Sequence, residues 1–201
     1  MLLDALGGLG TKTTYRGFNR ATQGLRQTGS SMKPLAVVVP AIDKKIITGA
    51  SIIDDTKDSF KNGTEQNYEP KNNDGYLGKV TLRRALESSQ NIPFVRIMEK
   101  LTPSTSIKYL KNMGITTLTD GDCNLALALG GIEKGISPLE MAGAYATIAN
   151  DGIYIEPVFY SKITTSDGLI VLESKQKTKK VFSKSVAYIV KELLTRACKW
   201  F

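Results

Sequence analysis

The chain has 201 residues, and its content of 41% hydrophobic and 23% charged residues is typical of one globular domain with a sizeable core. Its net charge is +8, but the basic residues are scattered, and no RNP signature or zinc-finger spacing accompanies them, which argues against a nucleic-acid binder. The chain has no His and no Cys-x-x-Cys motif, which excludes a Ser-His-Asp triad, a Cys-His dyad and most zinc sites.

Neither a membrane span nor an export signal is expected from this sequence. The longest apolar run, Pro34 to Ile42, is far too short to cross a bilayer, and the first residues lack the basic region and cleavage site of a signal peptide. We interpret the scattered positive charge as a solvated surface, which would also suit a protein that works beside an anionic cell wall.

The first part of the chain is expected to be mostly irregular. Residues 1–8 indicate the end of a strand that stops on glycines, and residues 9–29 indicate a polar, extended approach to Ser30. Residues 54–79 are rich in Asp, Asn, Lys and Gly, which is typical of a long surface loop or hairpin.

Helix signals are clearer after residue 80. Each of four helices is expected to begin at a residue that caps it or suits its first turn, and these residues are Thr81, Pro103, Ser137 and Ser183. The third start is a capping box, Ser137-Pro138-Leu139-Glu140, and the Ala and Gly residues that follow it predict a helix packed closely against neighbours. A strand pair is expected across residues 153–172, with its turn at Ser166-Asp167-Gly168.

The chemistry of the chain begins at Ser30-Ser31-Met32-Lys33. On a helix, side chains three residues apart share a face, so the Ser30 hydroxyl and the Lys33 amine can meet. Without a histidine, a lysine whose pKa is lowered by burial is the natural base for such a serine. The spacing by itself is weak evidence, because Ser174 and Lys177 repeat it in a highly charged stretch.

A second motif is Ser89-Gln90-Asn91, which is followed by Ile92-Pro93. A loop that places a hydroxyl and an amide two residues apart can relay a proton and hold a substrate amide. The same residues would also serve to end the helix before Pro93, and the motif alone does not separate these two interpretations.

The surroundings of these motifs resemble the transpeptidase domain of class A, bifunctional penicillin-binding proteins. The matching segments follow the family's order from about Ala5 to Leu194. They are FNRATQ at residues 18–23, RQTGSSMKP at 26–34, VTLRRAL at 80–86, SSQNIP at 88–93 and LALGGIEKGISPLEMAGAYATIANDGIYIEP at 127–157. The resemblance implies an α+β fold of the penicillin-binding transpeptidase and β-lactamase type, here incomplete, with a helical lobe and part of an antiparallel sheet.

The resemblance also implies a role for each motif residue. Ser30 matches the serine that is acylated by D-Ala-D-Ala stem peptides and by β-lactams. Lys33 matches the general base, and Ser89 matches the hydroxyl that carries a proton to the leaving group or from the acceptor amine. Asn91 matches the side chain that binds the substrate's peptide carbonyl. No metal or organic cofactor is implied, because the serine supplies the covalent chemistry.

The family's third motif, Lys-Thr-Gly or Lys-Ser-Gly, is missing from the sequence. Lys12-Thr13-Thr14 lies upstream of Ser30, and Lys177-Thr178-Lys179 lacks the glycine. We therefore expect residues 1–201 to be a partial transpeptidase domain, cut at both ends, without the glycosyltransferase domain and the membrane anchor. The family works at the extracytoplasmic face of the bacterial membrane and would reach the membrane through that anchor only.

Three other interpretations remain open from the sequence. The main expectation is a low-activity fragment of the enzyme. The first alternative is an inactive remnant that only binds stem peptides or a partner. A β-lactamase or D,D-carboxypeptidase shares the Ser-x-x-Lys motif, although the FNRATQ and SPLEMAGAYATIAN contexts favour the class A type. A basic nucleic-acid binder would require salt-dependent binding to DNA.

Overall fold

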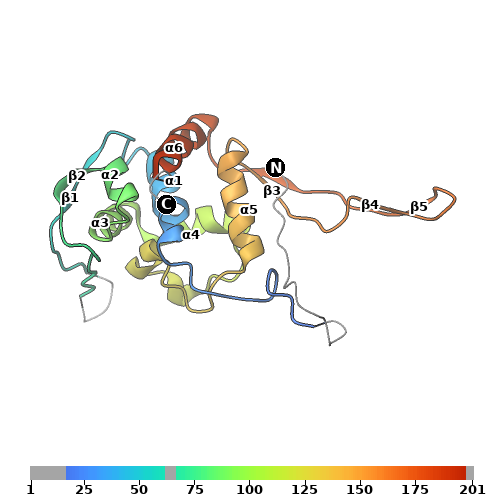
Figure 1. Ribbon diagram of the computed structural model, residues 1–201, viewed down its shortest axis with the longest axis horizontal. Coiled ribbons are helices and arrows are strands. Elements are labelled where there is room, and N and C mark those ends of the chain that lie inside the picture. The colour runs from blue at the N-terminus through green and yellow to red at the C-terminus, as the bar shows by residue number, and fades with distance from the viewer. Residues whose placement is uncertain (1–16, 62–66, 198–201) are drawn as a thin grey trace.

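The computed structural model describes residues 17–61 and 67–197, which form a helical body with a long β-hairpin extending from one side (Figure 1). The six α-helices among these residues are α1 (Val39–Asp43), α2 (Leu82–Glu87), α3 (Ile92–Leu101), α4 (Pro103–Asn112), α5 (Pro138–Ala149) and α6 (Lys184–Ala197). Short helices of other types are η1 (Gly29–Met32), η2 (Lys33–Val38), η3 (Asp120–Asp122) and η4 (Leu125–Leu129). The strands are β1 (Ile52–Asp55), β2 (Gly78–Thr81), β3 (Ile153–Ile155), β4 (Lys162–Thr164), β5 (Ile170–Glu173) and β6 (Thr178–Lys180).

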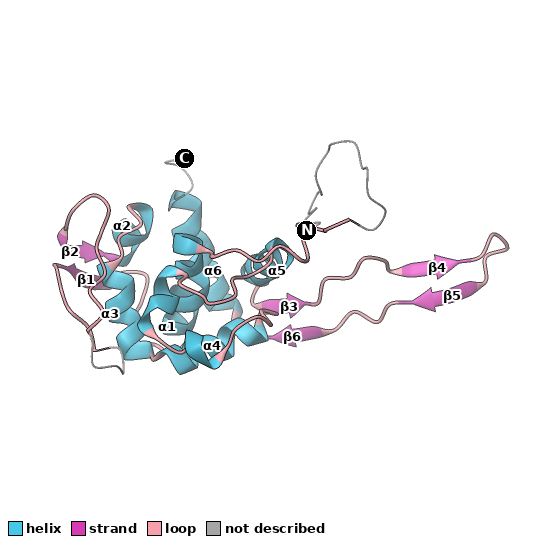
Figure 2. Ribbon diagram, turned by 90° about the horizontal axis from the view of Figure 1, so that it is seen from below, coloured by secondary structure: helices cyan, strands magenta, loops and turns pink. Residues whose placement is uncertain are grey.

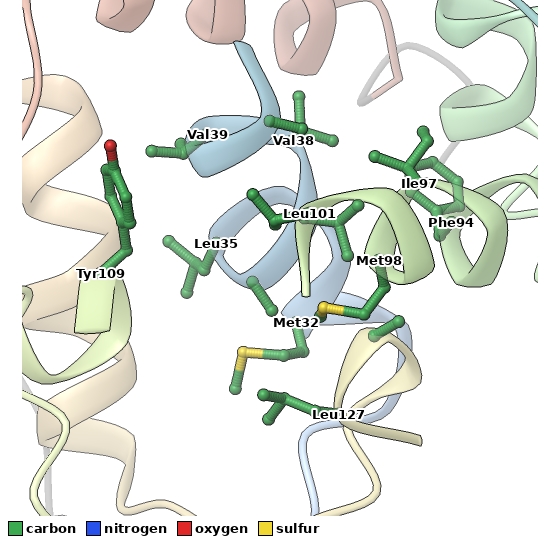
Figure 3. Close-up of a cluster of buried hydrophobic side chains, with 14 of the residues drawn as sticks. Met32, Leu35, Val38, Val39, Phe94, Ile97, Met98, Leu101, Tyr109 and Leu127 are labelled. Carbon is green, nitrogen blue, oxygen red and sulfur yellow. The ribbon is translucent and has the colours of Figure 1, made fainter. Parts of the chain in front are cut away.

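The centre of the body is the continuous helical run η1–η2–α1. Every residue from Met32 to Ile42 is buried, and α3, α4, α6 and η4 pack around this run. Figure 3 shows Met32 and Leu35 of the run facing Met98 and Leu101 of α3 and Leu127 of η4. An apolar stretch that is buried on all sides reads as nearly continuous hydrophobic sequence, which explains the run from Pro34 to Ile42.

The helix starts predicted from the sequence are confirmed where a cap was visible. The Thr81 hydroxyl accepts a hydrogen bond from the Arg84 N–H at 3.2 Å at the start of α2, and the Ser183 hydroxyl accepts one from the Val186 N–H at 3.3 Å at the start of α6. The capping box is present at Ser137 and Glu140, and Pro103 begins α4 with Thr102 as its cap. Only one face of α5 is buried, around Gly143, so the close packing expected for that helix is partial.

The helix α3 was missed, because Pro93 was interpreted only as the residue that stops the preceding helix. A proline also suits the first turn of a helix, where its missing N–H is not needed, and Pro93 occupies that place in α3. The central run was also expected to be an ordinary helix at Ser30, but it begins as a 3₁₀-helix and continues as a π-helix from Lys33.

The strands form three separate two-stranded antiparallel sheets. β1 pairs with β2, so the described part of the segment 54–79 is largely the loop of a hairpin, as its composition indicated. β4 pairs with β5 around the expected turn at Ser166-Asp167-Gly168. β3, however, pairs with β6 and not with β4, the next strand in the sequence. Where one strand pair was expected, the structure has two small sheets that follow one another along a single ribbon (Figure 2). The strand expected at residues 1–8 lies outside the described residues.

The described chain is therefore an α+β structure in which a helical lobe carries small antiparallel sheets, as the resemblance implied. Within residues 17–61 and 67–197, no helix combines the length and the apolar character that crossing a membrane requires.

Candidate functional site

The Ser30 segment sits at the solvent end of the buried helical run. Gly29 begins η1 with a φ of +55°, a conformation that glycine adopts at little cost, and Ser30 and Ser31 are exposed. Two contacts fix this turn: the Ser31 hydroxyl donates to the Thr28 carbonyl at 2.6 Å, and the Tyr145 hydroxyl of α5 donates to the Ser31 carbonyl at 2.7 Å. Ser30 is thus held by its neighbours while its own side chain faces solvent.

Gly130, at the end of η4, lies directly against this turn. A Cβ added at Gly130 would stand 2.4 Å from the Gly29 carbonyl oxygen and 2.6 Å from the Thr28 hydroxyl oxygen. Gly130 also has a φ of +78°, so both space and backbone conformation demand glycine here. Gly130 therefore lets the end of η4 approach the Ser30 turn closely.

Lys33 points inward, one helical turn after Ser30. Its side chain is 1% exposed, and its ammonium donates to the Ser89 carbonyl at 2.6 Å, to Asn91 Oδ1 at 2.8 Å and to the Ser89 hydroxyl at 3.1 Å. The Phe94 ring centroid lies 5.3 Å from Nζ. Burial lowers the pKa of Lys33 from 10.5 to about 8, so a substantial fraction is neutral near physiological pH.

The Ser89 loop closes α2 and faces Lys33 at the same time. The Ser89 N–H donates to the Leu86 carbonyl and the Gln90 N–H to the Ala85 carbonyl, which is the Schellman pattern of a helix end. Ser89 occupies the left-handed position of this motif, with a φ of +52°, where glycine is the usual residue. Both interpretations of the Ser89-Gln90-Asn91 motif are therefore compatible, since one turn ends the helix and delivers the hydroxyl.

The geometry gathers Lys33, Ser89 and Asn91 into one hydrogen-bonded cluster. Ser30 precedes Lys33 by one helical turn, but within the described residues no hydrogen bond joins its side chain to Lys33, whose three protons are taken by Ser89 and Asn91. The second Ser-x-x-Lys, at residues 174–177, lies in the exposed connection between β5 and β6.

Several residues around the cluster were not singled out from the sequence. Gly130 and Tyr145 support the Ser30 turn, and Asp55 and Asn72 support the Asn91 loop. Nothing in a single sequence marks Asp55 and Asn72, because they stand in a polar stretch that is typical of a surface loop. Among the described residues, no three His, Cys, Asp or Glu side chains gather as a metal site would require.

Comparison with known proteins identifies the family. The model of the penicillin binding protein transpeptidase domain matches residues 10–199. The chain is 40% identical over 190 residues to penicillin-binding protein 1F of Bacillus subtilis, covering 94% of this chain and 26% of that protein. It is also 40% identical over 200 residues to penicillin-binding protein 1A of Clostridium tetani, covering 94% of this chain and 25% of that protein.

Solved structures agree with these relatives. The crystal structure of penicillin-binding protein 1A from Haemophilus influenzae matches with a TM-score of 0.77 and 28% identity, over 90% of this chain and 31% of that one. The PonA1 protein from Mycobacterium tuberculosis, in complex with penicillin V, matches with a TM-score of 0.75 and 26% identity, over 89% of this chain and 48% of that one.

The chain spans about a quarter of the length of the curated relatives named above. Over that span the family model, the relatives and the fold all agree with the motifs around Ser30 and Ser89. The chain therefore belongs to the transpeptidase domain family of penicillin-binding proteins, of the class A type that its motifs indicated.

Proposed function

We propose that residues 1–201 are part of a D,D-transpeptidase domain that cross-links peptidoglycan stem peptides through an acyl-serine intermediate on Ser30. The observation that carries this proposal is the buried Lys33 ammonium, held by Ser89 and Asn91 in the same helical run as the exposed Ser30. A buried lysine with a pKa near 8 is suited to accept a proton from a hydroxyl at neutral pH.

Acylation would begin with neutral Lys33. In that form the amine keeps two N–H donors and has one lone pair, and its longest present contact, 3.1 Å to the Ser89 hydroxyl, is the one most readily given up. The lone pair takes the Ser30 proton while Oγ forms a bond to the carbonyl carbon between the two D-Ala residues. The Ser30 N–H donates to the oxyanion that develops.

Collapse of this intermediate would break the C–N bond to the terminal D-Ala. The proton on Lys33 passes through the Ser89 hydroxyl to the leaving amine, and the acyl group stays on Ser30 as an ester. An amine of a second stem peptide then attacks the ester, the bond between the acyl carbon and Ser30 Oγ breaks, and the amine's proton returns to Oγ along the reverse path. Asn91 Nδ2 has two protons, of which the Lys71 carbonyl accepts one, so the other is available for a substrate carbonyl.

The finer expectations about this polypeptide belong to the same proposal. Its partners would be D-Ala-D-Ala stem peptides and β-lactams, with no nucleic acid, at the extracytoplasmic face of the membrane that an N-terminal anchor would reach. The 201 residues alone would acylate slowly, because no Lys-Thr-Gly or Lys-Ser-Gly is among them to bind the substrate carboxylate. Loss of one oxyanion donor alone costs roughly 10²–10³ in rate.

A fluorescent penicillin tests these assignments. We expect slow labelling of the 201-residue polypeptide at a single peptide that contains Ser30, located by mass spectrometry after proteolysis. Ser30→Ala should abolish the label, whereas Ser31→Ala, the adjacent exposed serine, should retain it. Label on Ser31 or elsewhere would contradict the assignment of the nucleophile.

The rate separates the low-activity fragment from its alternatives. Fast stoichiometric labelling of Ser30 would contradict the low activity. No labelling above that of Ser30→Ala after prolonged incubation would favour an inactive remnant, and saturable binding of a stem peptide without acylation would then define what it retains.

A further inference from the structure

The helix that carries Asn91 is capped from a distant part of the chain. Asn91 is the N-cap of α3, yet its side chain makes no capping hydrogen bond. Instead, Asn72 Oδ1 accepts from the Asn91 N–H at 2.7 Å and from the Ile92 N–H at 3.2 Å. These are N–H groups at a helix start that lack partners within the helix, and a side chain from the loop between β1 and β2 supplies the acceptor.

This arrangement leaves the Asn91 side chain to the candidate site. Its Nδ2 donates to the Lys71 carbonyl at 2.6 Å, and its Oδ1 accepts from the Lys33 ammonium at 2.8 Å. Because a carbonyl can only accept, the Lys71 contact determines which end of the amide is nitrogen and therefore turns the oxygen toward Lys33. Lys71 and Asn72 together hold Asn91 by its backbone and by its side chain.

Asn72 is held in turn by a buried carboxylate. Asp55, at the end of β1, is 0% exposed, and it accepts from Asn72 Nδ2 at 2.7 Å and from the Leu77 N–H at 2.9 Å. The second Nδ2 proton of Asn72 goes to the Gly75 carbonyl at 3.0 Å. No ion pair of Asp55 is present among the described residues, so hydrogen bonds alone compensate its burial, which would otherwise be costly.

We infer that Asp55 and Asn72 are positioning residues of the acyl-transfer site: Asp55 orients Asn72, and Asn72 caps α3 so that Asn91 is free to hold the Lys33 ammonium. The inference rests on the proposed function for its meaning in catalysis. The pair links the β1–β2 hairpin to the site, so this hairpin is part of the active-site support and not only a surface excursion.

The test compares a disrupting change with a swap that rebuilds the contacts. Asn72→Ala removes the acceptor for both N–H groups. Asp55→Asn is the milder variant, since it keeps the shape but turns one oxygen into a donor. The double change Asp55→Asn with Asn72→Asp exchanges amide and carboxylate, so that residue 55 donates to residue 72 while both N–H groups of α3 and the Leu77 N–H keep an acceptor. The bond to Gly75 is lost, and the oxygen that replaces its donor faces the Gly75 carbonyl, a second acceptor.

Two readouts of the full chain at pH 6 follow the network. The first is hydrogen exchange of the Asn91 and Ile92 amides, and the second is proton exchange of the Lys33 ammonium, seen by ¹⁵N NMR and assigned with Lys33→Met. We expect both to accelerate by at least about tenfold in Asn72→Ala, the scale of one lost hydrogen bond, and by less in Asp55→Asn. The swap should bring both closer to the unsubstituted chain than Asp55→Asn alone does.

Matched controls exist for both positions. Asn73→Ala changes the adjacent exposed asparagine, and Asp74→Asn changes an exposed carboxylate of the same loop. Neither should alter exchange at Asn91, Ile92 or Lys33, and amide protection in α6 reports that each variant is folded. If Asn72→Ala does not fold, Asp55→Asn and the swap carry the comparison.

Unchanged exchange at the Lys33 ammonium in folded Asn72→Ala, or a swap no better than Asp55→Asn alone, would overturn the inference. Faster exchange at the α3 amides without an effect on Lys33 would mean that Asp55 and Asn72 only cap the helix, which would overturn the inference as well. Neither readout needs a substrate, so failure of the unsubstituted chain to react with penicillin would count against the proposed function and leave this test intact.

Discussion

Lys33 is the residue on which the proposed chemistry of the site depends most. A lysine that is 1% exposed has lost most of its hydration, and three hydrogen-bond acceptors on Ser89 and Asn91 replace it. Burial alone is the cause of its lowered pKa, because no charged neighbour contributes to the shift. The same environment that makes the ammonium tolerable in the core thus makes the neutral amine accessible at moderate pH.

The rate of Ser30 acylation should follow the titration of Lys33. Because the proposed base is the neutral amine, the rate should rise about tenfold per pH unit below pH 8 and level off above it. Lys33→Arg, which stays charged, should lose this rise and at least about 10² in rate. Time courses of penicillin labelling from pH 6 to 10 measure both effects.

Lys100→Arg is the control for this profile, since Lys100 is an exposed lysine at the far end of α3 and should leave it unchanged. An acylation rate that is constant across this pH range would exclude Lys33 as the base.

At Ser89, the side chain that the proposed chemistry needs is incompatible with the most stable residue for this backbone conformation, which is glycine. A non-glycine residue in the left-handed region costs about 1 kcal/mol or more, and Ser89 accepts this cost at φ +52°. Ser89→Gly should therefore stabilise the chain by roughly 0.5–1 kcal/mol in denaturant unfolding while it slows acylation, because the hydroxyl is gone. Ser88→Gly, at the preceding helix-cap residue, should not stabilise.

A Ser89→Gly chain that is less stable than the unsubstituted chain would contradict the backbone strain at residue 89. A Ser89→Gly chain that is acylated at the same rate would contradict the proton relay through its hydroxyl. Ser89→Ala separates the two, since it removes the hydroxyl and keeps the strained backbone.

At the scale of elements, the site depends on segments that meet from far apart in the chain. The Ser30 turn comes from η1, the Ser89 turn from the end of α2, and the supporting contacts from η4, α5 and the β1–β2 loop. The central run changes from 3₁₀ to π geometry at Lys33, and a π segment of this kind is frequent at functional sites.

Gly130 is the contact through which η4 constrains the Ser30 turn. Gly130→Ala should destabilise the chain by more than about 2 kcal/mol and slow acylation, since the new Cβ must displace the Gly29 backbone. Gly168→Ala is the matched control: Gly168 also has a positive φ, +87°, but nothing lies within 4 Å of its added Cβ, so only about 1 kcal/mol should be lost. Urea unfolding compares the two.

An equal loss of stability in the two glycine variants would mean that backbone conformation alone, and not the contact with Gly29, requires glycine at residue 130.

Local signals and long-range contacts differ sharply in how well a single sequence reveals them. The caps at Thr81, Ser137 and Ser183 were predictable because a cap acts within three residues. The pairing of β3 with β6 was not, since β4 and β5 lie between these two strands in the sequence and no local signal joins them. The contact of Asn72 with α3 leaves no trace in composition or periodicity, so the support of Asn91 appeared only with the structure.

At the scale of the whole molecule, the described chain consists of a body with a buried core and one projecting ribbon. The ribbon begins as β3–β6 against α5 and continues as β4–β5 away from the body (Figure 2). Large apolar side chains along the outer part are exposed, and these are Val158, Phe159, Tyr160, Ile163, Leu169, Ile170, Val171 and Leu172. An isolated two-stranded hairpin is marginally stable, so this part adds little to the stability of the body.

The ribbon can therefore be shortened without loss of the fold. The Glu156 N–H donates to the Lys177 carbonyl at 2.9 Å, so these two residues face each other where β3–β6 ends. Replacing residues 157–176 by Asn-Gly, the preferred two-residue hairpin turn, should close the ribbon at that point.

The midpoint of thermal unfolding should change by less than about 3 °C, because the removed residues bury little surface. Solubility should rise, because exposed apolar strands that pair edge to edge are removed. Penicillin labelling of Ser30 should be unchanged, since the site lies in the body. A non-cooperative unfolding transition would instead show that the outer ribbon is part of the folding unit.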